Sequence, residues 1–578
     1  MAKTEQALLQ VENLSVRFPT RFGEFTAVKE VDLVVNAGDI HGLVGESGAG
    51  KSTIGAAILG LLPGTGYISE GKISLLGDSL RELSAETYHQ LRGARISMIF
   101  QDPQTSLNPL LTISEQLVET IRQHSDLSVQ AAKDRALELL LETGIHDADQ
   151  RLDNYPHQFS GGMRQRVVIA LALCTDPELI IADEPTTALD VSVQKQILQL
   201  LQTLAQSRGV GFILITHDIG VIAQVTNRVT VLRNGRVMES GQTQQVLRQP
   251  KNDYTQALMA AVPRLETRLN RFVNIVDDDP TKDIDLSWQI EGASADVASE
   301  WLLNSTNAAA NVDESVILQV KDLEVAFNKG RPGWFKSKDS FKALSGISLN
   351  VGTGSVLGVI GESGSGKSTL AKAITGLVQP SSGQLYFQGE SLPFAKQRSR
   401  SHPVRQAIQM IFQDPYSSLN NRRTVEDIIS EPIRFYKLSN SRSEQRKLVA
   451  SMLDLVEMPQ QAMLKYPHQF SGGQRQRIAV ARSLVARPSF LICDEPTSAL
   501  DVSIQAQILN LLKDLQSHFG LSILFISHNL AVVRQMADNV IVLKRGRLVE
   551  SANSEEFFNH PKAQYSKQLL AESPSLEY

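Results

Sequence analysis

The sequence predicts an α/β fold with two domains, each formed around a mostly parallel β-sheet. The chain has 578 residues, more than a single hydrophobic core accommodates. Its two halves repeat the same glycine-rich segment, at residues 45–53 and again at 361–369. Within each half, short apolar runs alternate with longer amphipathic stretches, which is the pattern of parallel strands joined by helices. The two halves are therefore predicted to be copies of one domain.

The buried strands are predicted from runs that are apolar on both faces, as a parallel sheet requires. These runs are residues 179–182 and 212–215 in the first half, and 490–493 and 523–526 in the second. Residues 112–160 and 424–471 are more helical, and each predicts a helical subdomain. Leu137, Leu140 and Leu141 are expected to share one face of an amphipathic helix.

An acidic segment separates the two predicted domains, which are residues 1–263 and 316–578. The intervening linker, 264–315, lacks apolar periodicity, and up to residue 314 it contains 4 Lys or Arg against 11 Asp or Glu. An acidic stretch interrupted by Pro280 predicts a flexible linker or loosely docked chain. Parts of it are expected to dock on a domain face through two tryptophans, Trp288 and Trp301.

The composition excludes several classes of protein. A net charge of −5 argues against a general nucleic-acid binder, which usually has a basic excess. Two cysteines, Cys174 and Cys493, are too few for an all-cysteine zinc or iron–sulfur site, and both are expected in the core. The first residues lack the basic and apolar regions of a signal peptide, and no apolar run approaches the roughly 18 residues that span a bilayer. We therefore expect a cytoplasmic protein.

Each glycine-rich segment has the context of a phosphate-binding loop, because it follows a strand-like run and precedes a helical stretch. The glycines allow backbone N–H groups to surround phosphates, and the helix N-terminus adds a positive dipole. Lys51 and Lys367 are expected to reach the β- and γ-phosphates, and Ser52 and Ser368 to ligate Mg²⁺. The predicted phosphate-binding residues are Gly45, Glu46, Ser47, Gly48, Ala49, Gly50, Lys51, Ser52 and Thr53, and Gly361, Glu362, Ser363, Gly364, Ser365, Gly366, Lys367, Ser368 and Thr369.

Two adjacent carboxylates end a buried strand in each half: Asp183 with Glu184, and Asp494 with Glu495. Such a pair alone is more often a solvated strand end. Downstream of a phosphate loop in both halves, the aspartate is expected to hold Mg²⁺ and the glutamate to accept a proton from the attacking water.

A histidine ends the next apolar strand in each half, His217 in the first and His528 in the second. A lone histidine at a strand end more often makes a structural hydrogen bond. Because both histidines stand at the same distance after the aspartate, each is expected to contact the γ-phosphate.

Several further motifs resemble those of ABC ATPases. Residues 159–166 and 470–477 are similar to the signature motif, Gln101 and Gln413 to the Q-loop, and 188–190 and 499–501 to the D-loop. The resemblance implies a P-loop core with an antiparallel β subdomain and a helical subdomain in each half. It adds as nucleotide-binding residues Gln101, Ser160, Gly161, Gly162, Asp190, Gln413, Ser471, Gly472, Gly473, Gln474 and Asp501, with Gln101 and Gln413 also as Mg²⁺ ligands.

The resemblance also implies that the two halves form a head-to-tail sandwich with two ATP molecules between them. One site would place Ser471 and Gly473 opposite Lys51, Asp183, Glu184 and His217. The other would place Ser160 and Gly162 opposite Lys367, Asp494, Glu495 and His528. Closure with ATP and opening after hydrolysis would follow. The one departure is Met163, which stands where the second half has Gln474 and cannot donate a hydrogen bond. Both sites are expected to hydrolyse ATP.

In this family an aromatic residue upstream of each phosphate loop stacks on adenine. Phe18 or Phe25 is the candidate in the first half, and Phe327 or Phe341 in the second. Phe18 and Phe327 are preferred, although each candidate is also a plausible core residue.

Residues 101–108 and 155–162, with their copies in the second half, resemble the dipeptide, oligopeptide and nickel importer branch. The segments 249–263 and 560–570 are similar to the C-terminal extensions of that branch. These extensions carry a cysteine cluster in some members but not here, so no iron–sulfur cluster is expected. Importers of this branch usually have two ATPase chains; here they are fused, as in glutathione and microcin or peptide importers.

The resemblance implies an ATP- and Mg²⁺-dependent ATPase that energises solute import from the cytoplasmic face of a bacterial inner membrane. Two separate permease subunits and a periplasmic or lipid-anchored solute-binding protein are the expected partners, and no nucleic acid. Peptides, glutathione, nickel chelates, opines and short glycans all remain open as substrates.

The main alternative is a tandem ABC protein that acts on ribosomes as a translation factor. Such proteins usually have a charged helical linker that reaches RNA, whereas this linker is acidic and interrupted by Pro280, and phosphate would repel it. A DNA-repair ATPase is disfavoured further, because such proteins normally have zinc cysteines or a long coiled coil. An exporter with separate permeases is disfavoured by the importer-like extensions.

Overall fold

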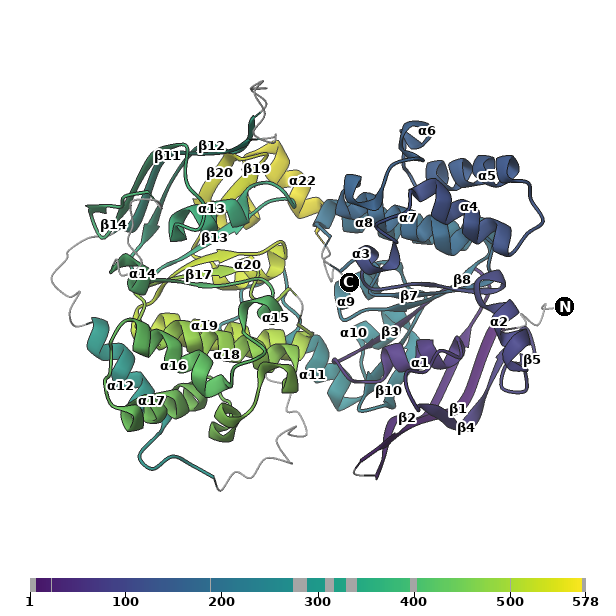
Figure 1. Ribbon diagram of the computed structural model, residues 1–578, viewed down its shortest axis with the longest axis horizontal. Helices are drawn as coiled ribbons and strands as arrows, with labels where there is room; N and C mark the ends of the chain where they lie inside the picture. Colours follow the sequence, from purple (N-terminus) through teal and green to yellow (C-terminus); the bar gives the residue numbers. More distant parts are fainter. Residues whose placement is uncertain are drawn as a thin grey trace. The chain divides into compact units, whose positions relative to one another are not determined.

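The computed structural model describes residues 7–21, 23–187, 189–273, 288–306, 316–328, 340–394, 403–498 and 500–573. These residues form two compact units, one ending at Val262 and the other running from Pro263 to Ser573 (Figure 1). Each unit contains one six-stranded and one four-stranded sheet with the same strand order in both. The prediction of two α/β domains with one architecture is confirmed.

Each unit contains a mostly parallel six-stranded sheet. In the first unit the order is β10-β9-β3-β8-β7-β6, and only β9 and β10 pair antiparallel. The second unit repeats it as β20-β19-β13-β18-β17-β16. The strands are β3 (Ile40–Gly45), β6 (Ile96–Ile99), β7 (Leu179–Asp183), β8 (Gly211–Ile215), β9 (Arg228–Arg233), β10 (Arg236–Gln242), β13 (Val356–Ile360), β16 (Ile408–Ile411), β17 (Phe490–Asp494), β18 (Ser522–Ile526), β19 (Asn539–Lys544) and β20 (Arg547–Asn553).

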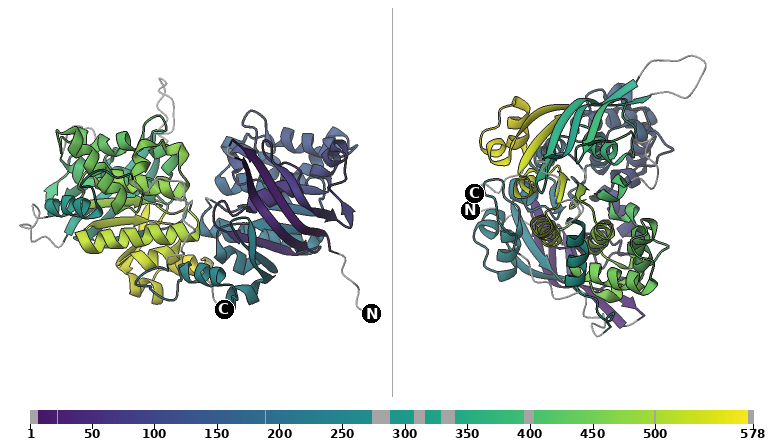
Figure 2. Two further views of the ribbon diagram at one scale, coloured as in Figure 1. Left: turned by 90° about the horizontal axis from the view of Figure 1, so that it is seen from below. Right: turned by 90° about the vertical axis from the view of Figure 1, so that its left-hand side faces the viewer.

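The four-stranded sheets are antiparallel, as the family resemblance implied. Their orders are β2-β1-β4-β5 and β12-β11-β14-β15. The long purple strands of the first of these sheets lie side by side in Figure 2 (left). The strands are β1 (Leu9–Thr20), β2 (Gly23–Val35), β4 (Tyr67–Leu75), β5 (Asp78–Ser79), β11 (Val316–Asn328), β12 (Ser340–Gly352), β14 (Ser382–Phe387) and β15 (Glu390–Ser391).

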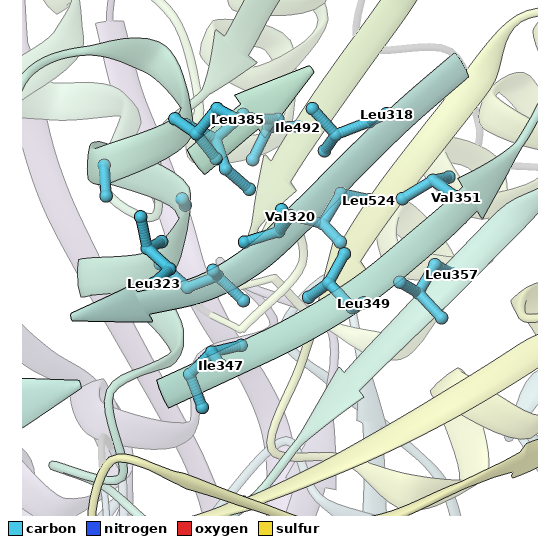
Figure 3. Packing of buried hydrophobic residues seen from close by; sticks show 14 of the residues in the cluster. Leu318, Val320, Leu323, Ile347, Leu349, Val351, Leu357, Leu385, Ile492 and Leu524 are labelled. Carbon is cyan, nitrogen blue, oxygen red and sulfur yellow. The ribbon is translucent and has the colours of Figure 1, made fainter. Parts of the chain in front are cut away.

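The core of each unit lies between its two sheets. In the second unit, leucine, isoleucine and valine side chains from β11, β12 and β14 meet those from β13, β17 and β18 (Figure 3). The first unit has the matching cluster, built from β1, β2 and β4 against β3, β7 and β8. Strands that are buried on both faces explain why residues 179–182 and 490–493 are continuous apolar runs.

Helices cover the six-stranded sheets and build the helical subdomains. The first unit contains α1 (Lys51–Ile58), α2 (Ala85–Ala94), α3 (Pro103–Ser106), α4 (Ile113–Gln123), α5 (Val129–Glu142), α6 (Ala148–Arg151), α7 (Gly161–Leu173), α8 (Val191–Arg208), α9 (Ile219–Val225), α10 (Thr243–Arg248) and α11 (Asp253–Ala261). The second contains α12 (Ala295–Thr306), α13 (Lys367–Thr375), α14 (Val404–Ala407), α15 (Pro415–Ser418), α16 (Val425–Phe435), α17 (Arg442–Leu455), α18 (Gly472–Leu484), α19 (Val502–Phe519), α20 (Leu530–Met536), α21 (Ser554–Asn559) and α22 (Gln564–Glu572).

The helical stretches predicted at 112–160 and 424–471 are present, as α4 to α6 and as α16 and α17, each followed by short 3₁₀ turns. One detail of the prediction is wrong. Leu141 is 50% exposed, whereas Leu139 is fully buried beside Leu140. The apolar stripe of α5 continues from Ala132 and Ala136 to this pair, so its direction differs from the one inferred from the leucines alone.

Part of the predicted linker packs within the second unit. Ile290 N donates to Gln460 Oε1 (2.7 Å), and Ser294 N, just before α12, donates to Ser451 Oγ (3.2 Å). The indole N–H of Trp301 donates to Val485 O (3.1 Å). Docking through Trp301 is therefore observed, while Trp288 is half-buried and residues 274–287 and 307–315, including Pro280, lie outside the described residues.

Both cysteines are buried and free. Burial raises the pKa of Cys174 to about 12 and also raises that of Cys493, so both thiols stay protonated at neutral pH. Their predicted place in the core is confirmed. Throughout the described ranges, no helix has the length and apolar character that a membrane span needs.

A buried histidine distinguishes the first core from the second. His41 in β3 is 2% exposed; its Nδ1–H donates to Val34 O (3.0 Å) and its Nε2 accepts from Thr230 Oγ1 (2.9 Å). Leu357 holds the matching position in β13, between the equivalent neighbouring strands. Burial lowers the pKa of His41 to about 4.

Acidification is expected to destabilise the first unit through His41. Because the folded pKa lies below the ordinary value, the histidine's contribution is complete above about pH 6.5 and is lost as the pH falls toward 4. The full loss corresponds to about 3 kcal/mol. His41→Leu, which copies the second unit, should remove this pH dependence. Hydrogen exchange of the amides of residues 40–45 in increasing urea, at about pH 7 and about pH 5, measures the free energy of unfolding. Equal pH dependence of that free energy in the wild type and in His41→Leu would contradict the expectation.

Candidate functional site

The phosphate loops connect β3 to α1 and β13 to α13, as predicted. The first glycine of each loop is irreplaceable on steric grounds: a Cβ on Gly45 would lie 2.2 Å from Leu232 O, and one on Gly361 equally close to Leu543 O. Both glycines also have positive φ, at 155° and 147°. The loop backbone thus lies directly against the end of the neighbouring strand, β9 or β19.

The loop lysines lie inside their loops. Lys51 Nζ donates to Gly45 O (2.7 Å) and Glu46 O (2.8 Å), and it is 8% exposed. Lys367 Nζ makes the same contacts, with Gly361 O (2.6 Å) and Glu362 O (2.9 Å). Each ammonium is therefore fixed at the N-terminus of α1 or α13, where the helix dipole and the loop N–H groups also favour an anion.

The paired carboxylates end β7 and β17. Glu184 and Glu495 have positive φ values, 48° and 49°, which are uncommon for glutamate. Their backbone N–H groups donate to Ile215 O (2.8 Å) and Ile526 O (2.9 Å) at the end of the next strand. The neighbouring strand therefore holds each glutamate in a strained conformation, a feature typical of functional sites.

Glu184 is the centre of a hydrogen-bond cluster. Its carboxylate accepts from Gln101 Nε2 (2.7 Å) and Thr187 Oγ1 (2.9 Å) and lies 2.9 Å from His217 Nδ1. Burial alone would raise the pKa of Glu184, but the hydrogen bonds from His217 and Thr187 outweigh it and lower the pKa to about 2. Burial alone would lower the pKa of His217. The hydrogen bond with Glu184 outweighs burial, so the pKa of His217 is raised. The carboxylate of Glu184 is therefore ionised at neutral pH, where it favours the protonated form of His217.

The second unit repeats this cluster with one contact fewer. Gln413 Nε2 donates to Glu495 Oε2 (2.8 Å), and His528 Nδ1 lies 3.2 Å from the same oxygen. Ser498, which matches Thr187, donates instead to the backbone oxygen of Glu495. The structure thus brings together three of the predicted residues in each unit, although the sequence assigned the glutamine to Mg²⁺ and the histidine to the γ-phosphate.

A hydroxyl and a carboxylate lie together beside each phosphate loop. Ser368 Oγ donates to Asp494 Oδ1 (3.0 Å), and Ser52 hydrogen-bonds Asp183. Burial raises the pKa of both aspartates. This oxygen pair suits Mg²⁺, which usually takes one or two protein ligands and completes its shell with phosphates and water. Within the described ranges, no cluster of three or more His, Cys, Asp or Glu offers a self-contained metal site.

The signature serines cap helices. Ser160 accepts from Met163 N (3.3 Å) at the start of α7, and Ser471 accepts from Gln474 N (3.4 Å) at the start of α18. Gln474 Oε1 also accepts from Ser471 N (3.1 Å), which completes a capping box that Met163 cannot form. The sequence predicts that Met163 lacks a hydrogen-bond donor that Gln474 supplies, whereas in the structure the Gln474 side chain acts as an acceptor.

The D-loop aspartates also cap helices. Asp190 accepts from Val193 N (2.9 Å) at α8, and Asp501 accepts from Ile504 N (3.1 Å) at α19. Ala188 and Ala499 lie outside the described residues. The aspartates therefore fix the direction in which each D-loop enters its helix.

The adenine-stacking candidates face each other across strand pairs. Phe18 is paired with Phe25, and Phe327 with Phe341. Phe18 is half-buried against the core and Gly66, whereas Phe25 is 59% exposed. Phe327 and Phe341 are both exposed. In the first unit, Phe25 therefore offers more free ring surface than the preferred Phe18.

The C-terminal extensions are built alike in both units. Glu239 in β10 accepts the N–H groups of Lys251 (3.0 Å) and Asn252 (3.2 Å), and Glu550 in β20 accepts those of Lys562 (2.8 Å) and Ala563 (3.0 Å). Each glutamate thereby holds the start of the last helix, α11 or α22, against the sheet edge.

Tyr565 links this extension to the phosphate loop of the second unit. The residue is 6% exposed, and its hydroxyl accepts from Glu362 N (3.3 Å). Lys544 Nζ lies 4.0 Å from the ring centroid. Tyr565 belongs to the predicted extension 560–570, but nothing in its spacing indicates contact with a loop some 200 residues earlier.

Tyr565→Phe is expected to weaken ATP binding at the second phosphate loop. The substitution removes the hydroxyl that accepts from Glu362 N, so the dissociation constant should rise about three- to tenfold, the factor of one hydrogen bond. Titration with a fluorescent ATP analogue in a Lys51→Ala background isolates this loop. Tyr386→Phe is the matched control, because Tyr386 also has a lysine over its ring (5.0 Å) and loses one hydroxyl contact, to Gln384. Equal affinities of the two variants would contradict the expectation.

Comparison with known proteins extends over both units. The ABC transporter family matches residues 28–187 and 344–498, which together are more than half of the chain. Residues 238–283 match the family described as the C-terminal region of oligopeptide and dipeptide transporters. That region includes the first extension, so the likeness of this extension to peptide transporters is confirmed.

Relatives match the chain along almost its whole length. A peptidoglycan transport ATP-binding protein, YejF, from Agrobacterium fabrum is 40% identical over 99% of this chain and 97% of its own. The glutathione import ATP-binding protein GsiA of Escherichia coli is 39% identical over 99% of this chain and 90% of its own. An uncharacterized ABC transporter ATP-binding protein YejF of Escherichia coli is 41% identical over 98% and 99%. The chain therefore belongs to the ABC transporter ATPases, as a tandem member with two ATP-binding domains.

Proposed function

We propose that this chain is the ATP-hydrolysing subunit of a bacterial importer for peptides or similar small solutes. The observation that carries the proposal is the pairing of two ABC transporter domains with a peptide-transporter C-terminal region on one chain. Relatives named for peptidoglycan transport and glutathione import support the same solute range. Their names differ in solute, and other subunits of the importer would select it.

In the proposed reaction, the chain's own residues bind ATP and remove a proton from water. Mg²⁺ would be held by Ser52, Asp183 and Gln101 in the first unit, and by Ser368, Asp494 and Gln413 in the second; it would neutralise charge on the phosphates. Glu184 and Glu495 accept the proton. Transfer of the His217 hydrogen bond from Glu184 to the γ-phosphate would free a carboxylate oxygen for that step.

The two ATP sites are proposed to be shared between the units, head to tail. Ser471 and Gly473 would complete the site that contains Lys51, and Ser160 and Gly162 the site that contains Lys367. Hydroxyl and backbone N–H groups at a helix N-terminus are good donors to a γ-phosphate. Asp190 and Asp501 would position the D-loops at the same surface.

Separate permeases are the proposed membrane partners, and a cavity in the second unit supports this. The cavity has a volume of about 440 Å³ and lies between β16, α16 and α18, next to Gln413. Phe412 and Phe435 line it and are 37% and 54% exposed. The lining mixes apolar side chains with charged ones such as Arg405, Glu431 and Arg482. A cavity of this kind beside the Q-loop suits a short amphipathic helix from a permease, because movement there would reach the ATP site directly.

Solute depletion from the medium tests the importer proposal. A strain lacking the gene, carrying either the wild type or Glu184→Gln with Glu495→Gln, would grow in a mixture of short peptides, glutathione, a nickel chelate, an opine and short glycans. We expect mass spectrometry to show depletion of a peptide or glutathione by the wild type alone. Depletion of every solute equally by both strains would contradict import driven by this ATPase.

A further inference from the structure

The segment that follows α11 lies on the second unit rather than on the first. Residues 263–273, here called the strap, begin directly after the first extension and pack against α19 and α20. The peptide-transporter family match runs through this segment to residue 283. The strap is therefore the tail of the first unit's C-terminal region by sequence, and part of the second unit by packing.

The side chain of Asn510 in α19 both accepts a hydrogen bond from the strap backbone and donates one to it. Phe272 N donates to Asn510 Oδ1 (3.0 Å), and Asn510 Nδ2 donates to Phe272 O (3.0 Å). Both residues are 3% exposed. A buried amide whose two polar ends pair with the N–H and the C=O of one residue recognises an extended main chain, whatever its side chains.

The side-chain amide of Gln535 in α20 also hydrogen-bonds the strap backbone, both as donor and as acceptor. Its Nε2 donates to Thr267 O (2.6 Å) and Arg264 O (2.9 Å), and its Oε1 accepts from Leu269 N (2.5 Å). The side chain is fully buried. Because an unpaired buried amide would be costly, this residue is explained only by the strap that covers it.

Charged groups add to the two amides. Arg268 pairs with Asp538 (3.2 Å) and Arg271 with Asp514 (2.9 Å). Lys513 Nζ donates to Leu269 O (2.8 Å). These contacts are more exposed, so they set direction and register more than affinity.

The first unit has no such pair of buried amides at the matching positions. Gln199 in α8 corresponds to Asn510, and Gln224 in α9 to Gln535, by the same offset that relates Asp183 to Asp494; both glutamines are exposed. The socket formed by Asn510 and Gln535 is thus a property of the second unit alone.

We propose that the strap is a non-covalent fastener: the tail of the first unit is recognised by the socket of the second and holds the two ABC units together without nucleotide. The occupant is this chain's own segment, 263–273, and recognition is mainly through its backbone. The fastener would keep the units paired after hydrolysis, when the ATP-dependent contacts are lost. It acts independently of the ATPase reaction and of any permease.

Cleavage of the purified, folded chain tests the fastener. A protease site is inserted between residues 274 and 287, so that after cleavage the strap stays on the first half, while α12 and the socket stay on the second. Without nucleotide, the wild-type halves are expected to co-elute in size-exclusion chromatography. Asn510→Ala with Gln535→Ala should weaken their association by about 100-fold or more, the factor of two lost buried amide pairs.

Matched variants separate the strap from other causes. Gln199→Ala with Gln224→Ala changes the equivalent positions of the first unit and should leave the halves together. Phe272→Pro removes a strap N–H and its ring without altering the second unit's own helices, so it tests the proposal even if the socket variant folds poorly; it should separate the halves. Separation of the wild-type halves, or co-elution of both the socket and strap variants, would overturn the proposal.

Discussion

Glu184→Gln with Glu495→Gln is expected to lower steady-state ATP hydrolysis by about 10²- to 10⁴-fold, the usual contribution of a general base, while ATP remains bound. Glutamine keeps the size of the side chain and can still bond to Gln101 and Gln413, but it accepts no proton from water. Phosphate release and nucleotide retention after desalting, measured on the same preparation, report the two effects.

The controls for this variant are exposed glutamates away from the loops. Glu86→Gln with Glu390→Gln alters the same number of charges, on α2 and β15, and should leave hydrolysis unchanged. Each single variant, at Glu184 or Glu495, shows whether one intact site sustains turnover. Near-wild-type hydrolysis by the double variant would contradict the assignment of both general bases.

Nucleotide retention is also expected to depend on which residues are changed together, because each ATP site is proposed to use both units. In the Glu184→Gln, Glu495→Gln background, Lys51→Ala with Ser471→Asp should disable one site only and retain about as much ATP as Lys51→Ala alone. Lys51→Ala with Ser160→Asp should disable both sites and retain almost none. Counting bound ATP per chain after desalting measures this.

Aspartate is the informative replacement at the two signature serines. Because it is as good an N-cap as serine, it should preserve the starts of α7 and α18, where Ser160 and Ser471 accept backbone N–H groups. Its negative charge would repel a γ-phosphate. Equal retention by the two combinations, or greater loss with Ser471→Asp than with Ser160→Asp, would contradict the head-to-tail arrangement.

The fold and the ATP-site motifs were predictable because local chemistry dictates them. A buried parallel strand must be apolar on both faces, and a loop that surrounds phosphates needs glycine where a Cβ would meet Leu232 O or Leu543 O. These constraints act over a few residues and are therefore visible in the sequence. The repeat reinforced them, since two copies of one motif in the same order rarely arise by chance.

The features that the sequence did not reveal depend on contacts between distant segments. Leu141 was placed on the wrong side of α5 because three leucines suggested a stripe that Ala132 and Ala136 actually define. The contact of Tyr565 with Glu362 joins the end of the chain to a loop in its middle. Asn510 and Gln535 are ordinary polar residues in their helices, and only the strap explains why they are buried.

Affinity purification of the tagged, full-length protein from detergent-solubilised membranes, with mass spectrometry of its companions, tests the central claim most directly. We expect two multi-span permeases in amounts comparable to the ATPase, with or without a solute-binding protein, and the same permeases with the Glu184→Gln, Glu495→Gln variant. Recovery of ribosomal proteins and no permease would contradict the importer and place the chain among translation factors.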